Sequence, residues 1–213
     1  GWASKSAYNK GQILYRIAEM LEGRKSQFIE ELMLQGSTQA QAEKEVELAI
    51  DRLVYYAGWS DKYQQVFSAV NPVDSSHFNF SMAEPMGIVS ALSSENYGLI
   101  GLVSLIAHAI VGGNTIIILA SSEKPLCAVT FGEVINSSDV PAGVVNILTG
   151  HRSELLTHFA NHMDVNAIMY SGDDAEEIAK IKELSSLNVK RALIYKGIDD
   201  MIENTHNGYR IMD

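Results

Sequence analysis

The sequence predicts an α/β fold, a doubly wound, Rossmann-like parallel sheet that is preceded by an N-terminal helical segment and a short β arm. Short runs of β-branched residues alternate with helical stretches from Pro85 onward, which is the pattern of parallel strands joined by crossover helices. Before residue 70, apolar residues instead recur at helical spacing. The chain has 213 residues, of which 46% are hydrophobic, so it can bury the core of one domain with a small accessory element.

The segment 1–70 is expected to be helical. In residues 7–22 apolar side chains recur on one helical face, and Gly23 is a typical stop. A short second helix is expected to follow. Thr38 and Gln41 have the spacing of a capping box, which predicts that a third helix begins directly after Thr38.

A short β arm is expected at residues 76–84. Residues 71–77 contain a proline and two serines and have the composition of a connecting loop. Beyond them, Phe78, Phe80 and Met82 alternate with polar or small residues, and this period of two is typical of a half-exposed strand.

The sheet itself is expected within residues 85–197, and residues 198–213 are expected to be a tail. The apolar stretch 99–120 is interrupted by a Gly-Gly-Asn sequence and contains His108, so it predicts a buried helix and a buried strand rather than a membrane span. The expected strands are 86–91, 115–119, 144–148, 167–170 and 191–195. The expected helices are 99–111, 125–135, 154–162 and 175–184. Ligands of such sheets bind beyond the carboxyl ends of the strands, so the candidate turns are those after Ala91, Leu119, Leu148 and Tyr170.

Composition narrows the classes of function and partner. The formal net charge is −10, and an acidic surface repels a phosphate backbone, so nucleic acid is not an expected partner. Cys127 is the single cysteine, which favours a reducing, cytoplasmic setting without disulfides or a thiolate metal cluster. His158 and His162 lack the glutamate of a zinc protease motif, since Phe159 follows the first histidine, and no metal site is expected. The chain begins at Gly1 without a leader, and we interpret it as a piece of a longer polypeptide.

Several short segments taken in order characterise the chain. They are Trp2 with residues 16–21, Tyr55-Tyr56-Ala57-Gly58, Glu84-Pro85-Met86-Gly87-Ile88-Val89, Asn96-Tyr97, Gly113-Asn114-Thr115, Pro125-Leu126, Val140-Pro141-Ala142-Gly143-Val144-Val145-Asn146-Ile147, Ser171-Gly172 and Lys190-Arg191. In this order and spacing they resemble the aldehyde dehydrogenase superfamily over nearly the whole chain. Residues 59–63 and 101–106 are most similar to the family-16 branch, whose members have a second, degenerate dehydrogenase-like region.

The resemblance implies three parts: a dinucleotide-binding domain, a catalytic domain with a nucleophilic cysteine, and an oligomerisation arm. This chain resembles the first part and some of the third. The nucleophile of the family lies beyond the strand that corresponds to residues 191–195, so we expect the chain to be unable to oxidise aldehydes by itself. Cys127 lies too early, in the helix after Pro125, and is expected to be a small buried hydrophobe.

Two positions correspond to catalytic residues of the family. Asn96 matches the asparagine whose amide stabilises the oxyanion, although Ser94 and Glu95 replace the proline and tryptophan of the family's turn. Without a nucleophile, we interpret Asn96 as a turn residue. Tyr195 falls on the general-base glutamate, in the run 195–199, and a phenol cannot replace a carboxylate base at neutral pH.

The positions that bind NAD or NADP in the family are also altered. The lysine and the glutamate of the ribose-binding motif fall on Leu119 and Ser122. The glycine-rich turn, which directs a helix N-terminus at the cofactor pyrophosphate, matches residues 172–177, where four carboxylates can satisfy the helix dipole and repel an anion. We therefore expect a vestigial crevice with no bound cofactor, formed by Leu119, Ser122, Gly150, Ser171, Gly172 and Asp173.

Two functions remain open. The first is a pseudoenzyme domain with a structural or assembly role in a larger dehydrogenase protein. The second is a functional NAD(P)-binding domain of an aldehyde dehydrogenase whose catalytic half lies outside this chain. The expected partner is a second copy or the rest of the parent polypeptide, through Phe78, Phe80 and Met82, with residues 99–111 near the contact. No membrane contact is expected.

Overall fold

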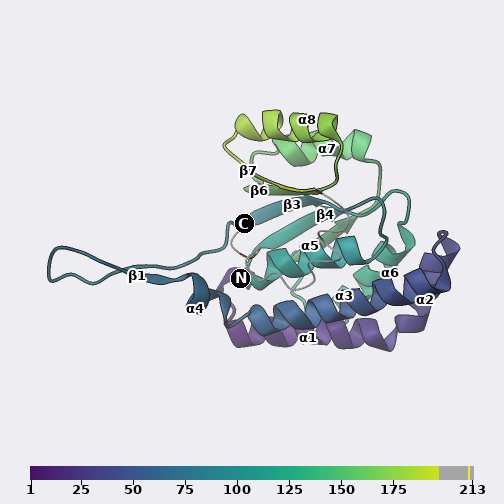
Figure 1. The fold of residues 1–213 in the computed structure, drawn as a ribbon, viewed down its shortest axis with the longest axis horizontal. Coiled ribbons are helices and arrows are strands. Elements are labelled where there is room, and N and C mark those ends of the chain that lie inside the picture. Colours follow the sequence, from purple (N-terminus) through teal and green to yellow (C-terminus); the bar gives the residue numbers. More distant parts are fainter. Residues whose placement is uncertain (197–210, 212–213) are drawn as a thin grey trace.

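A computed structural model describes residues 1–196 and 211 (Figure 1). A short 3-10 helix, Trp2–Ser4, opens the chain. The α helices are α1 (Ala7–Gly23), α2 (Lys25–Leu34), α3 (Gln39–Trp59), α4 (Tyr63–Phe67), α5 (Ile100–Val111), α6 (Leu126–Asn136), α7 (Arg152–Asn161) and α8 (Ala175–Ser186). The strands are β1 (Ala69–Asn71), β2 (Asn79–Ser81), β3 (Ile88–Leu92), β4 (Thr115–Leu119), β5 (Val145–Leu148), β6 (Ala167–Ser171) and β7 (Arg191–Tyr195).

Parallel strands form the central sheet in the order β5-β4-β3-β6-β7. Strand β3 lies in the middle and pairs with β4 on one side and with β6 on the other. Helices α5 and α6, with α1 to α3 outside them, cover one face, whereas α7 and α8 cover the other (Figure 1). The predicted doubly wound parallel sheet is therefore confirmed.

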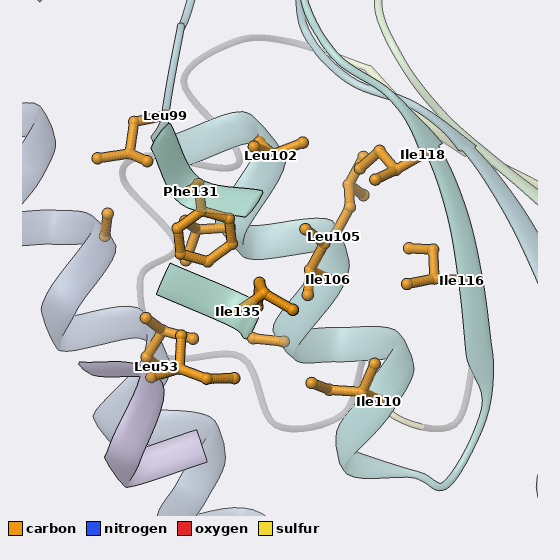
Figure 2. Close-up of a cluster of buried hydrophobic side chains, with 14 of the residues drawn as sticks. Leu53, Leu99, Leu102, Leu105, Ile106, Ile110, Ile116, Ile118, Phe131 and Ile135 are labelled. Carbon is orange, nitrogen blue, oxygen red and sulfur yellow. The ribbon is translucent and has the colours of Figure 1, made fainter. Parts of the chain in front are cut away.

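Helix α5 lies at the centre of the larger core (Figure 2). All 12 of its residues are buried, because the helix is enclosed between the sheet and the N-terminal helices. The expectation that residues 99–111 lie near a partner contact is therefore wrong, since this helix presents no exposed face. Leu53 of α3, Ile116 of β4 and Phe131 of α6 lie around it in Figure 2. Full burial of one such side chain stabilises the fold by about 1.5–3 kcal/mol, so the packing around α5 stabilises the contact between the N-terminal helices and the sheet.

The third helix begins where the sequence predicts. The backbone N–H of Gln41 donates to Oγ1 of Thr38 at 3.4 Å, and the N–H of Thr38 donates to Oε1 of Gln41 at 2.9 Å. Helix α4 was not expected. Its five residues are too few to show an apolar repeat, although Phe67 stacks on Trp59 with ring centroids 6.4 Å apart.

The arm is a hairpin that extends away from the rest of the molecule (Figure 1). Strands β1 and β2 pair antiparallel, with Val70 opposite Phe80. The expected strand is found at its centre, but β1 begins at Ala69, inside the segment 1–70 that was expected to be helical. The strand is also not half-exposed as predicted, since all three residues of β2 are exposed. The reason is that the hairpin extends into solvent, where no other element packs on either of its faces in the described part of the chain.

The other predicted boundaries in the sheet and its helices differ from the structure by no more than two residues at either end, and those of β4 and β7 coincide. Of the expected tail 198–213, only Ile211 is among the described residues, and it packs against the larger core. Within the described part of the chain, no helix has both the length and the apolar character needed to cross a membrane.

Candidate functional site

The order of the strands places a topological switch point at the centre of the sheet. From β3 the chain proceeds outward through β4 to β5, and then β6 and β7 are added on the opposite side of β3. The crevice between the carboxyl ends of β3 and β6 is where ligands of open α/β sheets bind. We therefore take the turns at this edge as the candidate site.

The side chain of Arg152, the first residue of α7, occupies the switch point. Its Nε lies 2.9 Å from Oε1 of Glu95, and its Nη1 lies 3.3 Å from Oε2 of Glu177. Its Nη2 donates to the carbonyl oxygens of Ser93, which follows β3, and Ser171, which ends β6. One guanidinium thus joins the two strands that border the crevice.

Tyr170 completes the packing around this guanidinium. The guanidinium carbon of Arg152 lies 5.2 Å from the ring centroid of Tyr170, within the range of a cation–π contact. The Tyr170 hydroxyl donates to Oε2 of Glu177 at 2.6 Å. Burial, together with this bond and the charge of Glu177, raises the pKa of Tyr170, so the phenol remains a protonated donor. A Cβ at Gly172 would lie 2.6 Å from the Tyr170 hydroxyl oxygen, so Tyr170 already fills the space beside this glycine.

Glu95 holds the other side of Arg152 and closes the turn after β4. Its Oε2 accepts from the backbone N–H of Ser122 at 2.7 Å and from the Ser121 hydroxyl at 3.0 Å. The Ser122 hydroxyl and the N–H of Glu123 lie at 3.2 and 3.4 Å from the same oxygen. Both oxygens of this carboxylate are therefore bound within the chain.

The first turn of α8 does not offer its N–H groups to a ligand. Oδ1 of Asp174 accepts from the N–H groups of Glu176 and Glu177, at 2.9 and 2.8 Å. Such a side-chain cap satisfies the donors that would otherwise bind a phosphate. With Arg152 at the switch point and Tyr170 beside Gly172, these residues do not fit the pyrophosphate of NAD or NADP at this turn.

Two of the remaining crevice residues, Ser122 and Gly150, border one hollow, whereas Leu119 lies in a core cluster and Asp173 lies in an exposed turn. Leu119 is 1% exposed and belongs to the smaller core cluster, on the α7 and α8 face of the sheet. Ser122 binds Glu95 and also lines the hollow beside Gly150. Gly150 adopts a positive φ of 156° and borders a shallow hollow of about 330 Å³, which Pro125 and Leu126 also line. Asp173 lies exposed in the turn before α8.

The two positions that match catalytic residues of the family have different surroundings. Asn96 is exposed in the turn after β3, where its N–H donates to Ser94 Oγ at 3.3 Å and its carbonyl accepts from Lys124 Nζ at 3.0 Å. Tyr195 lies in the larger core, with its ring centroid 5.9 Å from that of His108. Residues 197–199 of the run that the resemblance matched to the general base lie outside the described residues.

Cys127 is fully buried in α6, and its Sγ lies 3.9 Å from the carbonyl oxygen of Phe28. Burial raises the pKa of the thiol well above its ordinary range, so it is not a reactive thiolate. This environment agrees with the expected role as a small hydrophobe. Among the described residues, no group of three or more His, Cys, Asp and Glu side chains is arranged to hold a metal ion.

The charged run 43–47 predicts a solvated face of the third helix, but Glu45 is buried and caps the start of α5. Its Oε1 accepts from the N–H groups of Leu99 at 2.8 Å and Ile100 at 3.1 Å. Burial raises the pKa of this carboxyl, against the lowering effect of the two backbone bonds. Glu45 and Asn96 line a hollow of about 540 Å³ between α3 and the turn before α5.

Sequence reasoning missed the residues that fill the crevice, namely Arg152, Glu95 and Tyr170. A signal was available in the departures from the family: a glutamate replaces the tryptophan at position 95, and a serine replaces the glutamate at position 122. The structure places the Glu95 carboxylate against residue 122, so the two altered positions are in contact.

Comparisons with known proteins agree with this fold. The model of the "Aldehyde dehydrogenase family" matches residues 1–197. Aldehyde dehydrogenase 1A1 of Homo sapiens is 28% identical over 97% of this chain and 44% of its own length. The crystal structure of PnpE from Pseudomonas sp. WBC-3 superposes with a TM-score of 0.86 at 27% identity, over 92% of this chain and 40% of that protein.

A betaine aldehyde dehydrogenase of Staphylococcus aureus, solved in complex with NAD+, has a TM-score of 0.84 at 22% identity over 92% of this chain and 39% of that protein. At that identity the likeness concerns the fold alone. This chain spans about two fifths of the length of such relatives, from 39% to 44%.

Proposed function

This chain belongs to the aldehyde dehydrogenase family, and we propose that within it the chain is a non-catalytic module with a structural or assembly role in a larger dehydrogenase protein. The observation that best supports this proposal is the occupied switch point. Arg152 bridges β3 and β6 there, and Glu95 and Glu177 neutralise it from either side. The similarity of residues 59–63 and 101–106 supports a finer placement in the degenerate second region of the family-16 branch, and the lone Cys127 supports a cytoplasmic setting.

A cofactor could enter the crevice only if the ion pair of Arg152 and Glu95 separated, and this separation costs free energy. A dinucleotide pyrophosphate would have to displace a carboxylate from a guanidinium whose side chain is only 13% exposed. Separating a buried pair of this kind costs about 3–5 kcal/mol, and we take about 3 because Glu95 is 27% exposed. Since each ~1.4 kcal/mol is tenfold in affinity, this opening cost weakens binding by about a hundredfold relative to a crevice in which Arg152 is not already paired.

The test is the melting temperature of the chain with NAD+ or NADP+. A ligand at ~100 times its dissociation constant stabilises a fold by about 2.7 kcal/mol, which is readily seen in melting. We expect no saturable rise up to about 1 mM of either cofactor. The betaine aldehyde dehydrogenase of Staphylococcus aureus, solved with NAD+, serves as the positive control. A saturable rise for this chain would refute the proposal.

One observation favours the alternative, a functional NAD(P)-binding domain whose catalytic half lies outside this chain. The hollow beside Gly150 remains open at the carboxyl edge and is lined by apolar atoms of Pro125 and Val129. A cofactor that bound in this hollow, without its pyrophosphate contacting the turn before α8, would still raise the melting temperature. The same titration therefore distinguishes the two functions.

For assembly, we propose that the hairpin arm contacts a second copy or the rest of the parent polypeptide. Phe78, Phe80 and Met82 are 73%, 55% and 55% exposed, and the first two rings lie 5.5 Å apart. An apolar strand whose outer edge pairs with no other strand in the described part of the chain is a template for pairing.

Sedimentation of the native chain and of Phe80→Lys tests this proposal. We expect association at tens of micromolar for the native chain, and weaker association for the variant, because a charge then lies on the apolar arm. Leu34→Lys, at an apolar position at the end of α2 that is 79% exposed, is the control and should associate like the native chain. A monomeric native chain, or equal association of Phe80→Lys, would exclude the arm as the interface.

A further inference from the structure

The Glu95 carboxylate is bound in the way that a protein binds a free oxyanion. Its Oε2 receives backbone N–H groups of two successive residues, Ser122 and Glu123, and the hydroxyl groups of Ser121 and Ser122. Its Oε1 receives the guanidinium of Arg152. Successive backbone N–H groups next to an arginine are a typical anion-binding arrangement.

The donors are fixed by contacts that do not depend on Glu95. Arg152 is anchored by the carbonyl oxygens of Ser93 and Ser171 and by Glu177. Ser121 is 2% exposed, and its hydroxyl accepts from the N–H of Lys124 at 3.1 Å, which holds the turn. Removing the Glu95 side chain therefore leaves Arg152 Nε and the N–H groups of Ser122 and Glu123 in place without this acceptor. The Ser121 hydroxyl keeps the backbone carbonyl oxygen of residue 95, at 3.1 Å, as an acceptor.

We propose that residues 121–123 and Arg152 form an oxyanion site, for a carboxylate or a phosphate group, that Glu95 keeps closed. Glu95 acts as an internal ligand, and because it is tethered its effective concentration is millimolar or higher, so dilute external anions do not displace it. This inference deepens the proposed function, since it names the group that closes the crevice and the chemistry of what the crevice would bind.

The experiment is rescue of Glu95→Ala by small anions. We expect this variant to melt below the native chain in sodium chloride, because Arg152 and the turn lose their acceptor. Sodium formate or inorganic phosphate at the same ionic strength should raise its melting temperature saturably, by about 5 °C or more. The native chain, with the site filled, should show no more than the ordinary salt effect.

Glu154→Ala is the matched control, because Glu154 is exposed in the first turn of α7, two residues beyond Arg152. It should respond to formate as the native chain does. The double variant Glu95→Ala with Arg152→Met should lose the rescue, since the site then lacks its guanidinium. If Glu95→Ala does not fold in chloride, the yield of refolding in formate against chloride becomes the readout.

The inference is overturned if formate and phosphate raise the melting temperature of Glu95→Ala no more than chloride does, or if they raise that of the native chain and of Glu154→Ala as much as that of Glu95→Ala. If Glu95→Ala does not fold in chloride, a refolding yield that is no higher in formate than in chloride also overturns the inference. These outcomes do not depend on the cofactor titration, which uses the native chain. Failure of one proposal can therefore be told from failure of the other.

Discussion

Replacing Arg152 with methionine should destabilise the fold substantially, because it removes the charge and keeps the unbranched stem that packs near Tyr170. The loss leaves Glu95 and Glu177 without their shared cation, with side chains that are each 27% exposed. Removing one partner of a buried pair costs about 3–5 kcal/mol, and partial exposure of the carboxylates reduces this to about 2–4 kcal/mol. For a chain of this size, each kcal/mol of destabilisation lowers Tm by roughly 2–4 °C. A destabilisation of about 3 kcal/mol, the middle of the expected range, should therefore lower Tm by about 6–12 °C.

Urea unfolding of the native chain and the variant measures this free energy directly. Arg16→Met is the matched control, because Arg16 pairs with Glu19 at 3.3 Å with both side chains at least half exposed, and such pairs contribute only about 0.2–1 kcal/mol. A double-mutant cycle with Glu95→Gln should give a coupling of about 1 kcal/mol or more. If Arg152→Met costs no more than Arg16→Met, the bridge across the switch point does not stabilise the crevice and the reasoning fails.

Two further substitutions test the local account. Glu45→Gln keeps an acceptor for the N–H groups of Leu99 and Ile100 but has no charge. Burial raises the pKa of Glu45 in the folded state above its value in the unfolded state, so the ionised carboxylate destabilises the native fold at neutral pH. The native chain regains this stability as the pH falls through the folded pKa and Glu45 is protonated. The stability of the variant relative to the native chain should therefore be most favourable at pH 7 and decrease towards pH 4–5 in paired urea titrations, and a difference that is constant or grows on acidification would contradict this. Gly172→Ala should destabilise the fold by about 1–3 kcal/mol, because the new Cβ would lie 2.6 Å from the Tyr170 hydroxyl oxygen. Gly132→Ala in α6 is the control: its Cβ would have no atom within 4 Å, so it should be neutral or stabilising by up to ~1 kcal/mol. Equal unfolding midpoints for the two variants would contradict the steric argument.

The sequence predicts the elements whose signals are local. Thr38 and Gln41 specify the start of α3 through bonds between neighbours, and the β-branched run of β4 specifies a buried strand with its correct bounds. The order of β-α units then gives the parallel sheet, because crossovers between parallel strands are almost always right-handed. The turns at the carboxyl edge could be located for the same reason.

The contacts between side chains at those turns could not be predicted, because they depend on which residues of separate loops lie next to each other in the folded chain. Glu95 follows β3 and Arg152 follows β5, and only the folded sheet shows that both reach the same space. Capping of α8 by a carboxylate could be predicted from the acidic turn, whereas the pairing of Glu177 with Tyr170 and Arg152 could not. The first strand of the hairpin was missed because three residues around Val70 are too short for a period of two to be visible.

The central claim is that side chains of this chain occupy the crevice where a dinucleotide would bind. A crystal structure of the chain grown with about 1 mM NAD+ tests this most directly, at a concentration where a functional domain would be saturated. We expect Arg152 to bridge Ser93 and Ser171 with its Nε near 2.9 Å from Glu95, and no dinucleotide at the turn before α8. Density for NAD+ between β3 and β6, with Arg152 turned away from Glu95, would contradict the account.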